Sequence, residues 1–64
     1  MKNKIKETRE KIGMSQEQLS KESNVSRTII SGLENGTLEN TTSLTMEKIA
    51  IALNKTIEQL FFSN

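Results

Sequence analysis

Apolar residues recur in the first part of this chain at the three- and four-residue spacing of a helix, not at the two-residue spacing of a strand. Ile5, Arg9 and Ile12 fall on one helical stripe. Gly13 follows directly, and because glycine adopts positive φ at little cost, it ends helices well. The pattern predicts a first helix over roughly residues 2–12.

A polar cluster beginning at Ser15 predicts the start of a second helix. The Ser15 hydroxyl can accept a hydrogen bond from the Gln18 amide while the Gln18 side chain reaches back, which is a capping box. Asn24 tolerates the left-handed conformation that stops a helix. This helix is therefore expected at about residues 16–23.

A third helix is predicted over roughly residues 27–35, with Ser26 as its cap. Two short helices joined by a turn of about three or four residues form a helix-turn-helix, in which the first braces the second. The outward face of the third helix is small and polar and carries Thr28, Ser31, Gly32 and Asn35. Such residues weaken helices, so this face suits close approach to another surface, such as the floor of a major groove. A weak helix held by tertiary contacts is the alternative.

Two further helices are predicted after a polar loop. The fourth follows from a stripe at helical spacing, which consists of Met46, Ile49, Ala50 and Leu53. Asn54 can stop this helix, and Thr56 and Gln59 form a second capping box that begins a fifth. The chain is therefore assigned to the all-α class, with five short helices.

The composition limits what kind of protein this is. The chain has 64 residues, 33% of them hydrophobic, which suffices for one small core, so residues 1–64 are treated as one domain. Cysteine and histidine are absent, which excludes disulfides and ordinary zinc sites. No stretch approaches the roughly 20 apolar residues of a membrane span, and the first residues lack the apolar block of a signal peptide. We expect a cytoplasmic protein with no membrane partner, small-molecule ligand, metal or cofactor.

The charged residues are unevenly distributed, although the net charge is only +1. Residues 1–27 carry seven Lys or Arg and four Glu, whereas residues 28–64 carry two Lys and four Glu. The basic half is compatible with an anionic partner and equally with a solvated helix surface. Catalysis is not expected, because the chain has no His, Cys, Tyr or Asp to form a nucleophile–base pair.

These motifs in register closely resemble the phage-repressor and Cro-type helix-turn-helix family, also called XRE-like. The resemblance is carried by IKETREKIGMSQEQLS at 5–20, NVSRTIISGLENG at 24–36, and MEKIAIALN with IEQLF within 46–61. It implies a lambda-repressor-like DNA-binding domain whose helix after Ser26 enters the major groove. It places Arg27, Thr28 and Gly32 at the base-reading positions. An arginine can give guanine O6 and N7 a bidentate donor pair, and a threonine can offer a hydroxyl or a methyl group.

The resemblance and the helix ends also suggest contacts with the DNA backbone. The residues expected at phosphates are Gln16, Ser26, Ser31 and Asn35. Gln16 and Ser26 lie at helix N-termini, where amide protons and the helix dipole favour an anion. Ordinary helix capping would explain these two residues equally well.

Arg9 shares its stripe with apolar residues, so its guanidinium needs a partner. Glu34 is the partner that the resemblance implies, and the pair would tie the first helix to the end of the third. Some positions depart from the family pattern: Thr8 and Ser23 replace residues that are commonly apolar, which thins the core. Gly32 stands where a longer side chain often reads a base.

Proteins of this type typically act as dimers on near-palindromic sites. Ile51 lies off the fourth stripe, and it is expected with Phe61 and Phe62 at the surface of a homodimer. The expected function is a sequence-specific transcriptional regulator, a repressor that reads a short operator in double-stranded DNA. The alternative is a protein-interaction module that keeps the same core and has weak or no DNA binding.

Overall fold

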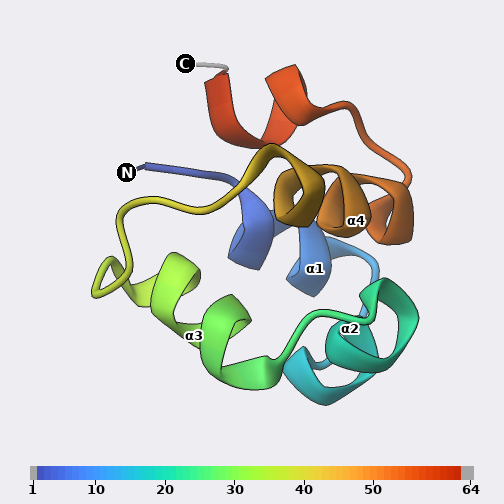
Figure 1. Cartoon of the computed structure of the whole chain (residues 1–64). Helices are drawn as coiled ribbons and strands as arrows, with labels where there is room; N and C mark the ends of the chain where they lie inside the picture. Colours follow the sequence, from blue (N-terminus) through green and yellow to red (C-terminus); the bar gives the residue numbers. More distant parts are fainter. Residues whose placement is uncertain (1, 63–64) are drawn as a thin grey trace.

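The computed structural model describes residues 2–62, which fold into helices with no strand among them (Figure 1). The elements are α1 (Ile5–Lys11), α2 (Gln16–Ser23), α3 (Arg27–Asn35), α4 (Ser43–Leu53) and a short π-helix, η1 (Glu58–Phe62). The predicted all-α class is confirmed. α2 packs against both α3 and α4, and α1 packs against α3. Figure 1 shows α2 and α3 along the lower edge of the molecule, with α4 and the C-terminal turn above them.

Side-chain caps begin three of the helices. The Oγ atoms of Ser15 and Ser26 accept hydrogen bonds from the backbone amide three residues later, at 3.0 and 3.2 Å, and Thr42 Oγ1 does the same at 3.1 Å. The Gln18 side chain does not reach back to Ser15, because it donates to Glu22 Oε2 at 3.0 Å. The first capping box is therefore half formed.

Left-handed residues end three of the helices. Asn24, Gly36 and Asn54 have φ angles of 59°, 84° and 57°, and they follow α2, α3 and α4.

The second capping box, formed by Thr56 and Gln59, is complete. Thr56 Oγ1 accepts from the Gln59 amide at 3.0 Å, and Gln59 Oε1 accepts from the Thr56 amide at 2.9 Å.

α1 is shorter than the predicted span of residues 2–12. Asn3 Oδ1 accepts from the Ile5 amide at 3.1 Å, and the Lys4 amide donates to the Leu60 carbonyl at 2.8 Å. These bonds compete with helical ones, so the chain becomes helical only at Ile5. Ile12 lies beyond the other end of α1 and is 56% exposed, so the last member of the predicted stripe faces solvent.

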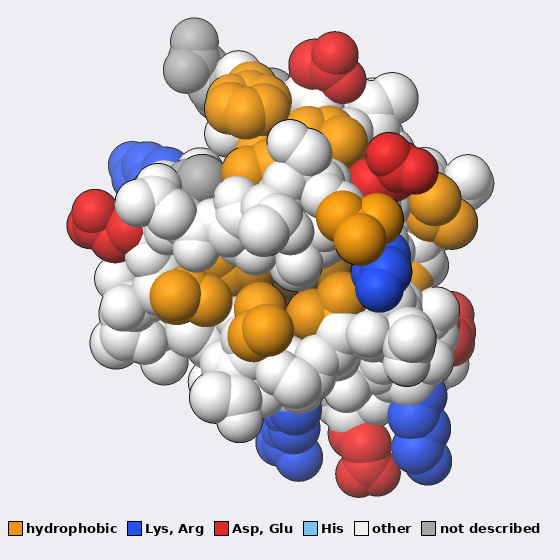
Figure 2. Space-filling model, viewed as in Figure 1, with side chains coloured by type: hydrophobic (Ala, Val, Ile, Leu, Met, Phe, Trp, Pro, Cys, Tyr) orange, Lys and Arg blue, Asp and Glu red, His pale blue; other side chains and the backbone are white. Residues whose placement is uncertain are grey.

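Large apolar side chains from every helix meet in the core. The fully buried ones are Ile5, Leu19, Ile30, Leu33, Ile49 and Leu60. Phe61 also belongs to this core and is only 5% exposed, so the expectation that it contributes to a partner surface is wrong. The large apolar residues left exposed are Ile12, Leu44, Ile51 and Phe62. Figure 2 shows further apolar side chains along the band between α3 and α4.

Two serine side chains fix the turn between α2 and α3. Ser20 Oγ donates to the Val25 carbonyl at 2.7 Å, and Ser23 Oγ accepts from the Val25 amide at 3.2 Å. Val25 is buried, so its two backbone polar groups need partners inside the protein. Ser23 therefore does more than thin the core: with Ser20 it satisfies both polar groups of a buried turn residue.

Replacing Ser20 by alanine should lower the free energy of unfolding by about 1 kcal/mol. Loss of the hydroxyl leaves a buried carbonyl without its donor, at a cost of about 1–3 kcal/mol, and the better helix propensity of alanine offsets about 0.5 kcal/mol. Urea denaturation measures the change. Ser43→Ala in α4 is the control, because Ser43 is exposed. Equal stability of the two variants would contradict the role given to Ser20.

Candidate nucleic-acid interface

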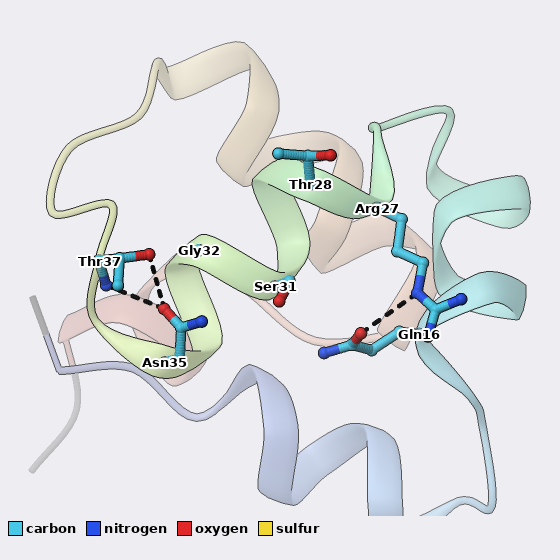
Figure 3. Close-up of a pocket in the computed structure, with 7 residues that line it drawn as sticks. All are labelled: Gln16, Arg27, Thr28, Ser31, Gly32, Asn35 and Thr37. Carbon is cyan, nitrogen blue, oxygen red and sulfur yellow. Dashed lines mark hydrogen bonds between the residues drawn. The ribbon is translucent and has the colours of Figure 1, made fainter.

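A shallow, open groove of about 470 Å³ runs beside α3 (Figure 3). It is lined by Gln16, Arg27, Thr28, Ser31, Gly32, Asn35 and Thr37. A second hollow of about 240 Å³ shares Gln16, Ser31 and Asn35 with the first and extends to Lys6 and Glu34. Because of these shared residues the two hollows form one polar surface, which we call the α3 groove.

The α3 groove presents mainly hydrogen-bond donors. Asn35 Oδ1 accepts from both the amide and the hydroxyl of Thr37, at 2.9 and 2.7 Å, so its Nδ2 group is left to donate outward (Figure 3). Within the described residues, the hydroxyls of Thr28 and Ser31 have no hydrogen-bond partner, so each can donate to a ligand or accept from it. Such a surface suits a ligand that is rich in acceptor atoms.

Gln16 and Arg27 lie together at one end of the groove (Figure 3). Gln16 Nε2 donates to Glu34 Oε1 at 3.0 Å, and Gln16 Oε1 accepts from Arg27 Nε at 3.3 Å. Arg27 is exposed, and its two terminal nitrogens make no hydrogen bond within the described part of the chain. A guanidinium held in this way can still offer a pair of parallel donors.

Arg9 and Glu34, which are paired in the sequence analysis, form a bidentate ion pair in the wall of the groove. Arg9 Nε lies 2.8 Å from Glu34 Oε2, and Arg9 Nη2 lies 3.0 Å from Oε1. The two side chains are only 10% and 4% exposed. Arg9 Nη1 also donates to the Met14 carbonyl at 2.9 Å. One guanidinium thus ties α1 to the end of α3 and to the loop before α2.

The ion pair shifts the pKa of both of its members. Burial on its own would raise the pKa of Glu34, but hydrogen bonds from Arg9 and Gln16 outweigh it, so the pKa lies below its ordinary value. The hydrogen bond to Glu34 raises the pKa of Arg9 above its ordinary value. The carboxylate that lines the groove is therefore ionised at neutral pH and is neutralised by a fixed cation.

A comparison with protein families agrees with this geometry. The model of a family described as helix-turn-helix matches residues 5–60, which is most of the chain. The chain belongs to the helix-turn-helix family. The match is to the XRE type, consistent with Cro and repressor proteins, and it makes the chain a DNA-binding regulator of a family that is generally non-enzymatic. No curated protein matches the chain.

Most of the expected DNA-contacting residues of this helix-turn-helix protein line the α3 groove. They are Gln16, Arg27, Thr28, Ser31 and Asn35. Ser26 is not among the lining residues, and its Oγ caps α3. Capping uses the Ser26 oxygen as an acceptor, so its hydroxyl proton stays available for a phosphate.

Gly32 has a packing role that the sequence did not predict. It is buried, and a Cβ atom built on it would lie 3.0 Å from Leu38 Cβ and 3.5 Å from Thr37 Oγ1. Its carbonyl accepts from the Leu38 amide at 3.0 Å. Its small size therefore lets the loop after α3 pack against the helix, and its expected role in base reading stays a prediction.

Lys6 and Thr37 line the groove and were missed by the sequence analysis. Lys6 precedes Arg9 by three residues, so the two are neighbours on α1, and this spacing could have revealed it. Thr37 has no comparable signal, because its position depends on how the loop packs over Gly32.

Among residues 2–62, every helix is too short or too polar to span a membrane. No group of three or more carboxylate, histidine or cysteine side chains in the same residues could hold a metal ion.

The stability contributed by Glu34 should depend on pH. Because folding lowers the pKa of Glu34, its contribution is present at pH values above the ordinary pKa of 4.5. The contribution is lost as the pH falls through the lower pKa of the folded state. At pH 7, Glu34→Gln should reduce the free energy of unfolding by about 1–3 kcal/mol. The difference from the unmodified protein should shrink steadily in urea titrations toward pH 3. Glu47→Gln, at an exposed site on α4, should show no such trend. If the loss of unfolding free energy in Glu34→Gln is the same at every pH, the lowered pKa of Glu34 is wrong.

Gly32→Val distinguishes two explanations for the slim face of α3. If Gly32 makes room for Leu38, the larger side chain overpacks this contact and lowers the free energy of unfolding by about 1–3 kcal/mol. If the position is slim only to approach a partner, valine should slightly stabilise the free protein, because it is a better helix former than glycine. Thermal denaturation without DNA decides between them.

Proposed function

We propose that this chain is a sequence-specific transcriptional regulator that inserts α3 into the major groove of double-stranded DNA. The observation that supports this most strongly is the donor character of the α3 groove. Phosphate oxygens and the O6 and N7 atoms of guanine are all acceptors, so duplex DNA complements such a surface. The one carboxylate that lines the groove, Glu34, is already neutralised by Arg9.

The residues that we propose contact DNA divide into two roles. Arg27 and Thr28 are in the first turn of α3, and we assign them to base edges. The two terminal nitrogens of Arg27 can donate to guanine O6 and N7, which gives about 1–3 kcal/mol of discrimination. The remaining donors hold phosphates and fix the register on the duplex, and they are Lys6, Gln16, Ser26, Ser31 and Asn35.

We further propose that two copies bind a near-palindromic operator. One α3 reads only a few base pairs, and a second copy about 34 Å away along the duplex extends the site. Ile51 and Phe62, which are 71% and 66% exposed, are the apolar residues available for the partner copy. A dimer bound over a promoter blocks access to it, so repression is the proposed outcome.

Selection of bound duplexes from a random library tests sequence reading. A near-palindromic motif with a guanine in each half should emerge. In Arg27→Ala the preference for that guanine should fall by about 5-fold to 150-fold, the value of a bidentate pair. If no motif emerges and binding vanishes at physiological salt, the protein-interaction alternative replaces this proposal.

Lys6→Ala should weaken binding to all duplexes equally and reduce the slope of log K against log salt by about 0.9, because one phosphate contact is lost. Fluorescence anisotropy across a salt series measures the slope. Lys55→Ala is the control, because Lys55 is exposed and does not line the α3 groove. Identical slopes for Lys6→Ala and the unmodified protein would remove α1 from the interface.

Sedimentation with the selected duplex tests the dimer. Two chains per duplex are expected, and combined Ile51→Ser and Phe62→Ser substitutions should reduce affinity for the full site toward that of a half-site. Both residues are exposed, so the monomer fold should be retained. A single chain per full site would contradict the dimer.

A further inference from the structure

We propose that Glu34 is a positioning residue for base reading and acts on Arg27 through the side-chain amide of Gln16. This inference rests on the proposed function, in which Arg27 reads a guanine. It assigns to Glu34 a role in sequence specificity in addition to its ion pair with Arg9.

The four side chains form a continuous series of hydrogen bonds across three helices. Arg9 donates to Glu34 at 2.8 and 3.0 Å, Gln16 Nε2 donates to Glu34 Oε1 at 3.0 Å, and Arg27 Nε donates to Gln16 Oε1 at 3.3 Å. The series starts at a buried cation on α1 and ends at the exposed guanidinium at the start of α3.

The chemistry of the end groups fixes the direction of the series. A carboxylate only accepts hydrogen bonds and a guanidinium only donates them. The Gln16 amide must therefore turn its nitrogen toward Glu34 and its oxygen toward Arg27. Because both neighbours demand the same orientation, the amide has one favourable state, in which Arg27 faces its oxygen and not its nitrogen.

This arrangement selects which donors Arg27 offers to DNA. Its Nε atom is engaged by Gln16, so the two terminal nitrogens remain as the pair that can face guanine. Holding the guanidinium before DNA arrives also reduces the side-chain entropy lost on binding. A guanidinium released from Gln16 would read guanine less selectively.

Replacing both partners of the ion pair separates positioning from stability. In Arg9→Met with Glu34→Met, no unpaired charge is left and the similar side-chain volume keeps the contact between α1 and α3. Gln16 then has no anionic anchor. We expect discrimination between the selected guanine and adenine to fall about threefold or more, which corresponds to one side-chain hydrogen bond. In an Arg27→Ala background the same pair of substitutions should have no further effect on the ratio of affinities for guanine and adenine at that position, which we call the guanine-to-adenine ratio.

Asn3→Ala is the matched control. Asn3 Nδ2 donates to the Leu33 carbonyl at 3.0 Å, so it also ties the N-terminal segment to α3 but does not touch the series. It should lower stability and leave the guanine-to-adenine ratio unchanged. If Asn3→Ala and the double methionine variant change the ratio equally, Glu34 only supports the fold and the proposal is wrong.

Gln16→Met tests the same proposal if the double methionine variant does not fold, because it leaves the ion pair intact. Loss of a Gln16–phosphate contact would weaken binding to all DNA sequences equally. Loss of the positioning of Arg27 would instead lower the guanine-to-adenine ratio. An unchanged ratio in Gln16→Met would overturn the proposal.

NMR of the Arg27 Nε–Hε group tests the series without DNA. Its signal should show slow proton exchange and restricted motion in the unmodified protein and lose both in Gln16→Met and the double methionine variant. If this ordering is found but no DNA motif is selected, the proposed function fails and the hydrogen-bond series stands. If Arg27 is equally mobile in all three proteins, the positioning role is wrong whatever the DNA results show.

Discussion

The buried ion pair between Arg9 and Glu34 is the interaction on which the placement of α3 depends. Burying two charges is unfavourable unless their polar atoms are hydrogen-bonded, and here bonds to the Met14 carbonyl and from Gln16 add to those within the pair. The pair holds the C-terminal end of α3 against α1. At the other end of the same helix, Ser20 and Ser23 bind the buried Val25 backbone and fix the turn.

A short helix of weak intrinsic propensity can be kept rigid in this way. α3 contains Thr28, Ser31 and Gly32, which are poorer helix formers than alanine or leucine. Ile30 and Leu33 bury its inner face, and polar side chains hold both of its ends. The outer face is consequently free to carry donors instead of residues chosen for helix stability. The small size and the polarity of this outer face have separate causes. Gly32 leaves room for Leu38 to pack against α3. Asn35 turns its amino group outward because its side-chain oxygen accepts hydrogen bonds from Thr37.

The parts of this structure that depend on local sequence could be predicted, and those that depend on tertiary contacts could not. Caps at Ser15 and Ser26 and left-handed stops at Asn24 and Asn54 gave the helix boundaries, because each acts within a few residues. The start of α1 was missed because the Lys4 amide bonds to the distant η1 turn. The burial of Phe61 and the packing role of Gly32 were missed for the same reason, since a periodic pattern does not show which neighbours cover a residue.

In the proposed complex, the α3 groove is the surface that binds duplex DNA. An NMR titration of isotope-labelled protein with a short duplex at low salt tests it directly, because even non-specific binding should use this surface. We expect shifts concentrated at the side-chain amides of Gln16 and Asn35 and at the backbone of the first turn of α3. Leu44 and Glu47, which are exposed on α4 and lie outside the groove, should change little. Shifts confined to α4 and η1, or none at any duplex concentration, would contradict the claim.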